Sequence, residues 1–161
     1  MTNNWVMTLT EVRERTNIAN NVHDNTLTPH MRQVHLKRLT RILGKALYDE
    51  IVDQVTNETL TSANNTLLED YLKDLTAWLV ATQYHKTGHL RSGEKGVNKE
   101  GEHQDSLALY YIAVSSFDTW KEDMLNFIDK NIADYPSYNL TTDHEIYPKD
   151  TSKYNGSDII L

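Results

Sequence analysis

Three histidines near the middle of the chain are the first residues that could do chemistry. His85 and His89 are four residues apart, and His103 follows a glycine-rich stretch. Because residues at this spacing share one face of a helix, their imidazoles could ligate a metal ion. The chain has no HExxH motif, however, and a chance spacing accounts for the pair. Histidine cations at the C-terminus of a helix would also offset the helix dipole. We therefore expect no functional metal.

Adjacent carboxylates are the second candidates for chemistry. The pairs are Asp49-Glu50, Glu69-Asp70 and Glu122-Asp123. General acid–base catalysis would need burial to raise the pKa of one carboxyl, whereas these pairs fall on the polar faces of predicted helices. The sequence also lacks the GxSxG, P-loop and GxGxxG patterns of hydrolases and nucleotide-binding proteins. It therefore predicts no enzymatic activity and no cofactor.

A basic cluster stands out in an otherwise acidic chain. No acidic residue occurs between Pro29 and Tyr48, and four cations there lie on one arc of a predicted helix. Three interpretations are open: a solvated face paired with acids of a neighbouring helix, a contact with an acidic protein, or a contact with the DNA backbone. The four cations are Lys37, Arg38, Arg41 and Lys45.

The composition limits what these residues can do. The 161 residues fit one domain with one core. The absence of cysteine excludes disulfides, thiolate nucleophiles and cysteine-bound metal centres. A net charge of −7 argues against a protein that scans duplex DNA. No apolar run approaches the roughly 18 residues of a membrane span, and the N-terminus has neither the basic start nor the apolar stretch of a signal peptide. We therefore expect the protein to be made and kept in the cytoplasm unless a particle carries it out.

The N-terminal part predicts one short and one long helix. The short helix covers residues 9–15, capped by Thr8 or Thr10, and an Asn-rich loop follows at residues 17–28. Thr28 and Pro29 then suit the start of a long helix, which runs to about Gln54 and is interrupted or bent at Gly44. Its expected buried stripe is Leu36, Leu39, Leu43, Ala46 and Leu47.

Two further long helices are predicted. One runs from a Ser62 cap to about Lys86, and the other from about residues 104–106 to Ala133. The segment 91–104 between them is polar and glycine-rich, which indicates an exposed loop or a two-stranded hairpin. Trp78 and Trp120 fall at or near the apolar stripes and are expected in the core. The stripe of the last helix is Leu107, Tyr110, Tyr111, Val114, Phe117, Met124, Leu125, Ile128 and Ile132.

These patterns predict an all-α fold: a bundle of three long helices plus a short N-terminal helix, an exposed loop or hairpin at 91–104, and an extended C-terminal arm. The helical domain is expected at residues 1–135 and the arm at residues 136–161. The basic cluster, the loop and the arm are the expected protein interfaces. Their candidate residues are Lys37, Arg38, Arg41, Lys45, Arg91, Lys95, Val97, Lys99, Tyr138, Tyr147, Tyr154, Ile159, Ile160 and Leu161.

Three stretches resemble a known family. The first is EVRERTNIANNV with PHMRQVHLKRLTRILGKALYDEI, whose Leu43-Gly44 and 47–50 look like an "LG..LYDE" signature. The second is LLEDYLKDLTAWLVATQYH, and the third is GEKGVNKEGEHQDSLA, similar to a "kGv..k.g" connection. In this order, over roughly residues 9 to 130, they resemble the head–tail connector (neck adaptor) proteins of tailed phages.

The resemblance implies a helical virion protein of the phage neck. Such proteins form a ring, commonly of twelve copies, that joins the portal protein to the tail or to a lower neck protein and extends the DNA channel. From the net charge we expect an acidic or neutral channel that DNA passes without specific binding, and a basic cluster that faces a protein. The alternative is a helical DNA-binding protein that uses the basic face of the first long helix.

Overall fold

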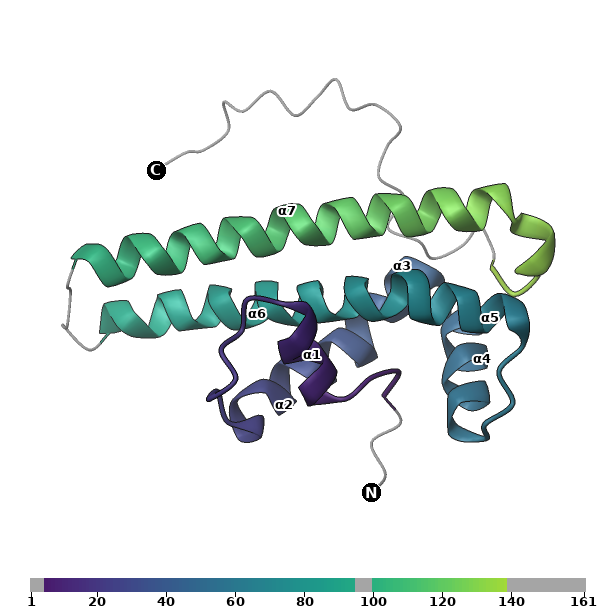
Figure 1. Cartoon of the computed structure of the whole chain (residues 1–161), viewed down its shortest axis with the longest axis horizontal. Coiled ribbons are helices and arrows are strands. Elements are labelled where there is room, and N and C mark those ends of the chain that lie inside the picture. The colour runs from purple at the N-terminus through teal and green to yellow at the C-terminus, as the bar shows by residue number, and fades with distance from the viewer. Residues whose placement is uncertain (1–4, 95–99, 139–161) are drawn as a thin grey trace.

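The computed structural model describes residues 5–94 and 100–138, and the side chains of residues 5–87 and 107–138 among them. Every regular element of this part of the chain is helical, which confirms the predicted all-α class. The two longest elements of the described ranges are α6 (Lys73–Glu94) and α7 (Glu100–Lys130). They lie side by side and run in opposite directions (Figure 1).

This helical hairpin corrects the predicted loop at 91–104. Residues 91–94 belong to α6 and residues 100–104 to α7, so Gly93 and Gly101 lie within helices. A glycine inside a helix costs about 1 kcal/mol relative to alanine, which the packing of two long helices along one another can offset. The hairpin predicted around Gly96-Val97-Asn98 lies outside the described residues.

The N-terminal helices pack on α6 away from α7. α1 (Leu9–Arg15) has the predicted bounds, and Thr8 caps it in a capping box with Glu11. α2 (Asp24–Gln33) follows and also contacts α6, so that α6 lies between α7 and the N-terminal helices (Figure 1). The prediction that this helix starts at Pro29 is wrong, because Arg13 binds the Val22 carbonyl oxygen at 2.8 Å and pairs with Asp24, which holds the earlier turn in place.

The predicted interruption at Gly44 is confirmed as a sharp corner. A π-helical turn, η1 (Val34–Leu39), leads into the short α3 (Thr40–Leu43), and α4 (Lys45–Thr56) begins directly after Gly44. Gly44 has φ 77° and ψ 151°, a region in which a side chain would clash. The chain therefore turns, and α4 runs across the long axis of α6 and α7 (Figure 1).

The cap of the helix after α4 lies one residue earlier than predicted. Thr61 is the cap of α5 (Ser62–Leu67), and its hydroxyl accepts from the Asn64 backbone N–H at 3.2 Å. Ser62 is instead the first helical residue. A second π-helical turn, η2 (Leu68–Leu72), joins α5 to α6.

The core contains most of the predicted apolar stripes, with four corrections. Leu36 is 68% exposed, Tyr111 60% and Ile132 39%, and Ala46 is exposed as well. The π turn explains Leu36: it takes one residue more than an α turn and rotates His35 into the core in place of Leu36. The fully buried centre of the core includes Leu27, Met31, Leu39, Leu43, Leu47, Ile51, Leu67, Leu72, Leu75, Leu79 and Met124.

The end of the described chain packs back on the helices. α7 is followed by a 3₁₀ turn, η3 (Ile132–Asp134), and the buried Tyr135 donates its hydroxyl to the Ala63 carbonyl oxygen at 2.9 Å. Tyr138 is half-buried against the core. Trp78 and Trp120 also pack against the core, as predicted. No helix in the described ranges is both long enough and apolar enough to span a membrane.

Candidate protein-interaction site

The structure divides the predicted basic cluster. Gly44 places Lys45 on α4, so it does not share a helix face with the cations before the corner. Lys45 pairs with Asp49 one turn later, an exposed pair of the kind expected on a solvated face. Lys37 and Arg41 are exposed and Arg38 is partly buried on η1 and α3.

A different group of residues shares the exposed side of α2 and η1. Arg32 lies one turn before Leu36, and Lys37 is next to Leu36; all three are exposed. We call Arg32, Leu36 and Lys37 the basic face. The sequence pattern did not indicate Arg32, because it predicted that Leu36 is buried. No local signal located the π turn that exposes the side of the helix on which Arg32 and Leu36 lie.

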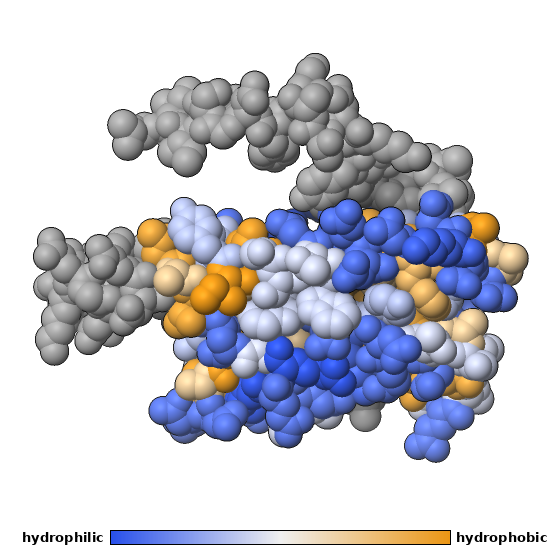
Figure 2. Space-filling view, turned by 45° about the horizontal axis from the view of Figure 1, so that its top comes forward, coloured by the Kyte–Doolittle hydropathy of each residue, from blue (hydrophilic) through white to orange (hydrophobic). Residues whose placement is uncertain are grey.

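A second exposed surface lies along α7, on the side away from α6. Tyr111 and Ile112 are 60% and 51% exposed near its start. Further along, the surface is acidic: Asp118, Glu122, Asp123 and Asp129 are all exposed. Figure 2 shows this change in character, with hydrophobic surface toward the left end, where α7 begins, and hydrophilic surface beyond it. We call these six residues the α7 face.

The residues of the "LG..LYDE" stretch form the corner at Gly44. Leu43 and Leu47, on either side of Gly44, are fully buried. The Tyr48 hydroxyl lies 2.9 Å from His35 Nδ1, and Trp5 stacks on the His35 ring. Burial lowers the pKa of His35 to about 4, while burial and then the nearby Asp49 carboxylate raise the pKa of Tyr48 to about 12. Both groups are therefore neutral near pH 7.

Glu50, from the same stretch, joins three parts of the chain. Its Oε1 accepts from Asn64 Nδ2 at 2.8 Å, and its Oε2 accepts from the Ser137 hydroxyl. Asn64 is buried and also donates to Gln54 Oε1 at 2.9 Å. The expectation of a solvated Asp49-Glu50 pair is thus wrong for Glu50, because folding brings α5 and the end of the described chain against it. It is a bound structural carboxylate.

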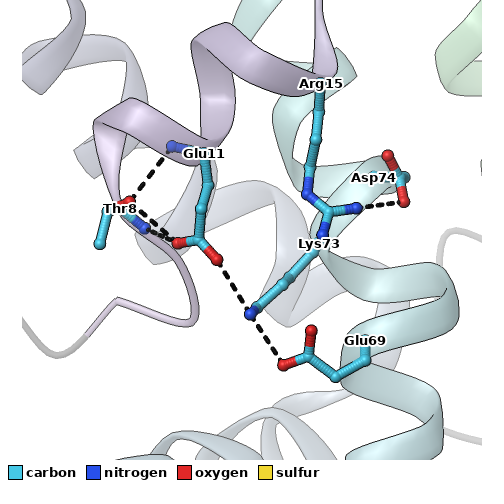
Figure 3. Close-up of polar contacts among 6 residues, drawn as sticks. All are labelled: Thr8, Glu11, Arg15, Glu69, Lys73 and Asp74. Atoms are coloured by element: carbon cyan, nitrogen blue, oxygen red, sulfur yellow. Dashed lines mark hydrogen bonds and ion pairs between the residues drawn. The ribbon is translucent and has the colours of Figure 1, made fainter.

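The EVRERTNIANNV stretch joins the N-terminus to α6 (Figure 3). Lys73 pairs with Glu11 at 2.9 Å and with Glu69 at 2.7 Å, and Arg15 pairs with Asp74 at 2.6 Å. Burial acts to raise the pKa of Glu11, but the hydrogen bonds from Thr8 and Lys73 outweigh it and lower that pKa overall. Burial likewise acts to lower the pKa of Lys73, whereas its bonds to Glu69 and Glu11 raise it overall.

The histidine candidates for a metal site are only partly described. His85 is buried, and its Nε2 lies 3.0 Å from Asn17 Oδ1. Burial lowers the pKa of His85. The side chains of His89 and His103 lie outside the described residues. Among the side chains that are described, no group of three His, Asp or Glu residues could hold a metal ion.

Most of the other predicted interface residues cannot be placed. Arg91 lies in α6, but its side chain falls in the stretch left undescribed. Tyr138 is partly buried and packs against the hydrophobic core of the helices. The remaining candidates lie outside the described residues: Lys95, Val97, Lys99, Tyr147, Tyr154, Ile159, Ile160 and Leu161.

The chain is similar to a known protein family. A family of unknown function, DUF6712, matches residues 39–146, which is more than half of the chain. The match begins at the end of η1 and includes the Gly44 corner, α6 and α7. No curated protein and no solved structure matches the chain.

Proposed function

We propose that this chain, which belongs to the DUF6712 family, is a structural subunit of a tailed-phage neck. Copies would form a ring between the portal and the tail or a lower neck protein, and DNA would pass through the ring without specific binding. In this role the chain acts by binding proteins, and it works in the virion. The proposal rests on the resemblance to head–tail connectors, whose residues can be examined in the fold.

One observation carries the proposal: the residues that resemble the connector family make the contacts that shape this fold. Gly44 makes the corner, Tyr48 binds His35, and Glu50 binds α5 and Ser137. In the N-terminal stretch, Glu11 and Arg15 pair with η2–α6 residues. The stretches that carry the likeness therefore have structural roles, which supports a shared architecture.

Exposed surfaces also suit an assembling subunit. The basic face and the α7 face each combine charge with exposed apolar side chains. Patches of this kind are typical of protein-binding sites. In a ring, every subunit is held by two neighbours as well as by the portal, so that moderate individual contacts give a stable assembly.

The proposal is tested by mixing the purified chain with its cognate portal ring. We expect electron microscopy and native mass spectrometry to reveal many copies stacked as a ring on the portal. The chain without portal, and the portal without chain, are the controls. A stable monomer or dimer that ignores the portal would contradict the proposal.

The alternative, a DNA-binding protein, is favoured by one observation. Arg32, Lys37 and Arg41 are exposed on a stretch without acidic residues. That function predicts binding to duplex DNA that weakens steeply as salt rises. Lys37→Glu should then weaken binding and reduce its salt dependence, whereas Lys130→Glu, at an exposed lysine on α7, should change binding little. We favour a protein partner because Leu36 lies exposed among the cations.

A further inference from the structure

We propose that the basic face of one copy docks on the α7 face of a second copy, head to tail. The basic face is Arg32, Leu36 and Lys37, and the α7 face comprises Tyr111, Ile112 and the four acids defined above. This inference deepens the proposed function and rests on it for the closed ring, because this contact would join neighbouring subunits.

Charge is the first argument for this partner. None of the ion pairs among the described residues uses Asp118, Glu122, Asp123 or Asp129. Lys130 is the only exposed cation among the described side chains of α7. A surface of this kind repels nucleic acid and favours a cationic protein surface. The stretch from Pro29 to Tyr48, which has no acid, supplies such a surface on the same chain.

The position of the two faces is the second argument. α6 lies between α7 and the N-terminal helices, and the α7 face points away from α6 (Figure 1). The basic face is on α2 and η1, which pack on α6 from another side. The two faces of one molecule therefore cannot meet, and a contact between them requires a second copy. Because the two faces differ, the contact is heterologous and generates rings or filaments rather than a closed dimer.

Apolar side chains provide the third argument. Leu36 is 68% exposed beside Arg32 and Lys37, and Tyr111 and Ile112 are 60% and 51% exposed on the α7 face. Exposed large apolar residues flanked by charge suit an interface in which an apolar centre is buried and the surrounding charges set partner and register. Each face therefore offers both parts of a specific contact.

Charge reversal on each face tests the inference, because mixing the two variants should restore the association that each variant loses. One variant carries Arg32→Glu and Lys37→Glu, and the other carries Asp118→Lys, Glu122→Lys and Asp123→Lys, so that the net charge of each altered face changes sign. Each variant alone presents two faces of like charge, so we expect self-association at least about tenfold weaker than in the wild type by analytical ultracentrifugation. In an equal mixture each altered face meets an opposite charge, and both unaltered faces still match. The mixture should therefore associate as the wild type does.

Two controls accompany this experiment. Circular dichroism should show that both variants keep the helical fold, since all five substituted residues are exposed. Lys45→Glu with Asp49→Lys reverses an exposed pair on α4 and should leave association unchanged. Association of either face variant at the wild-type level, or a mixture that stays dissociated, would overturn the inference.

Cross-linking detects the same contact when it is weak. The chain has no cysteine, so Leu36→Cys and Ile112→Cys place single thiols on the two faces. A bis-maleimide should join a mixture of the two variants into a dimer and leave each variant alone largely monomeric. Thr56→Cys, exposed at the end of α4, replaces Leu36→Cys in the control mixture and should give no dimer. Absence of the Leu36–Ile112 product at high protein concentration would overturn the contact.

The outcomes separate this inference from the proposed function. Rings that form on the portal from both charge-reversed variants would overturn the head-to-tail contact and leave the neck function supported. The predicted pattern of association in a chain that ignores the portal would support the contact and count against the neck function. Binding of the basic face to duplex DNA, with no association between copies, would reject both.

Discussion

The His35 ring and the Tyr48 hydroxyl meet across the Gly44 corner, with 2.9 Å between Nδ1 and Oη. This bond connects η1 to α4 directly, so it fixes the angle at which the chain turns. Trp5 covers the ring, and His35 Nε2 is buried without a hydrogen-bond partner in the described structure. The corner therefore depends on a histidine that must remain neutral.

The first prediction concerns the pH dependence of stability. The pKa of His35 is about 4 in the folded chain and 6.5 in the unfolded chain. Above pH 6.5 the residue is neutral in both states and adds no pH dependence. As the pH falls from 6.5 toward 4, the unfolded state takes up the proton first, so His35 destabilises the fold by up to about 3 kcal/mol.

His35→Gln removes this titration while keeping a side chain that can bind Tyr48. We expect urea unfolding to show a smaller loss of stability between pH 6.5 and 4 in this variant than in the wild type. His23→Gln replaces an exposed histidine and should retain the wild-type pH profile. The buried His85, whose pKa is also lowered, contributes a remaining slope of the same sign. An unchanged slope in His35→Gln would contradict the prediction.

The second prediction tests the corner itself. Gly44 occupies a backbone region that is almost exclusive to glycine, so Gly44→Ala should lower the free energy of unfolding by about 1 to 3 kcal/mol. Ala46→Gly, two residues later and exposed, is the control and should cost about 1 kcal/mol or less. Thermal unfolding measures both. An equal or smaller effect at Gly44 would mean that the corner relaxes without strain.

The third prediction separates Glu50 from its neighbour. Glu50→Ala removes the acceptor for Asn64 and Ser137 and should cost about 1 to 3 kcal/mol, because their polar groups lose a partner inside the fold. Asp49→Ala breaks only an exposed pair with Lys45 and should cost about 0 to 1 kcal/mol. Urea unfolding at pH 7 compares them. Similar losses for the two variants would argue that Glu50 is solvated after all.

The fourth prediction distinguishes two neighbouring candidates for a helix cap. Thr61 accepts the Asn64 N–H, so Thr61→Ala should cost about 1 kcal/mol. Ser62, the cap expected from the sequence, is the first residue inside α5, and Ser62→Ala should change stability by a few tenths of a kcal/mol at most. Thermal unfolding of the two variants decides between the positions. A larger effect at Ser62 would contradict the observed cap.

The basic face was only partly predictable from the sequence. The residue types before Tyr48 indicate a cationic surface, but the predicted members of that surface assume an unbroken helical period. The π turn and the Gly44 corner changed that period at two points. Lys45 consequently lies outside the basic face, which includes Arg32 and Leu36 instead.

Local chemistry, read from the sequence alone, determined the helical class, the bounds of α1 and the break at Gly44, whereas the choice between Thr8 and Thr10 as the cap needed the structure. Caps, glycines and apolar periods act within a few residues, so no distant partner is needed to read them. The tertiary structure alone decided that α6 and α7 extend into the predicted loop from its two ends, that His35 replaces Leu36 in the core, and that Glu50 is bound. Each of these features depends on contacts with residues far along the chain. The free energy of that packing outweighs the local conformational preferences.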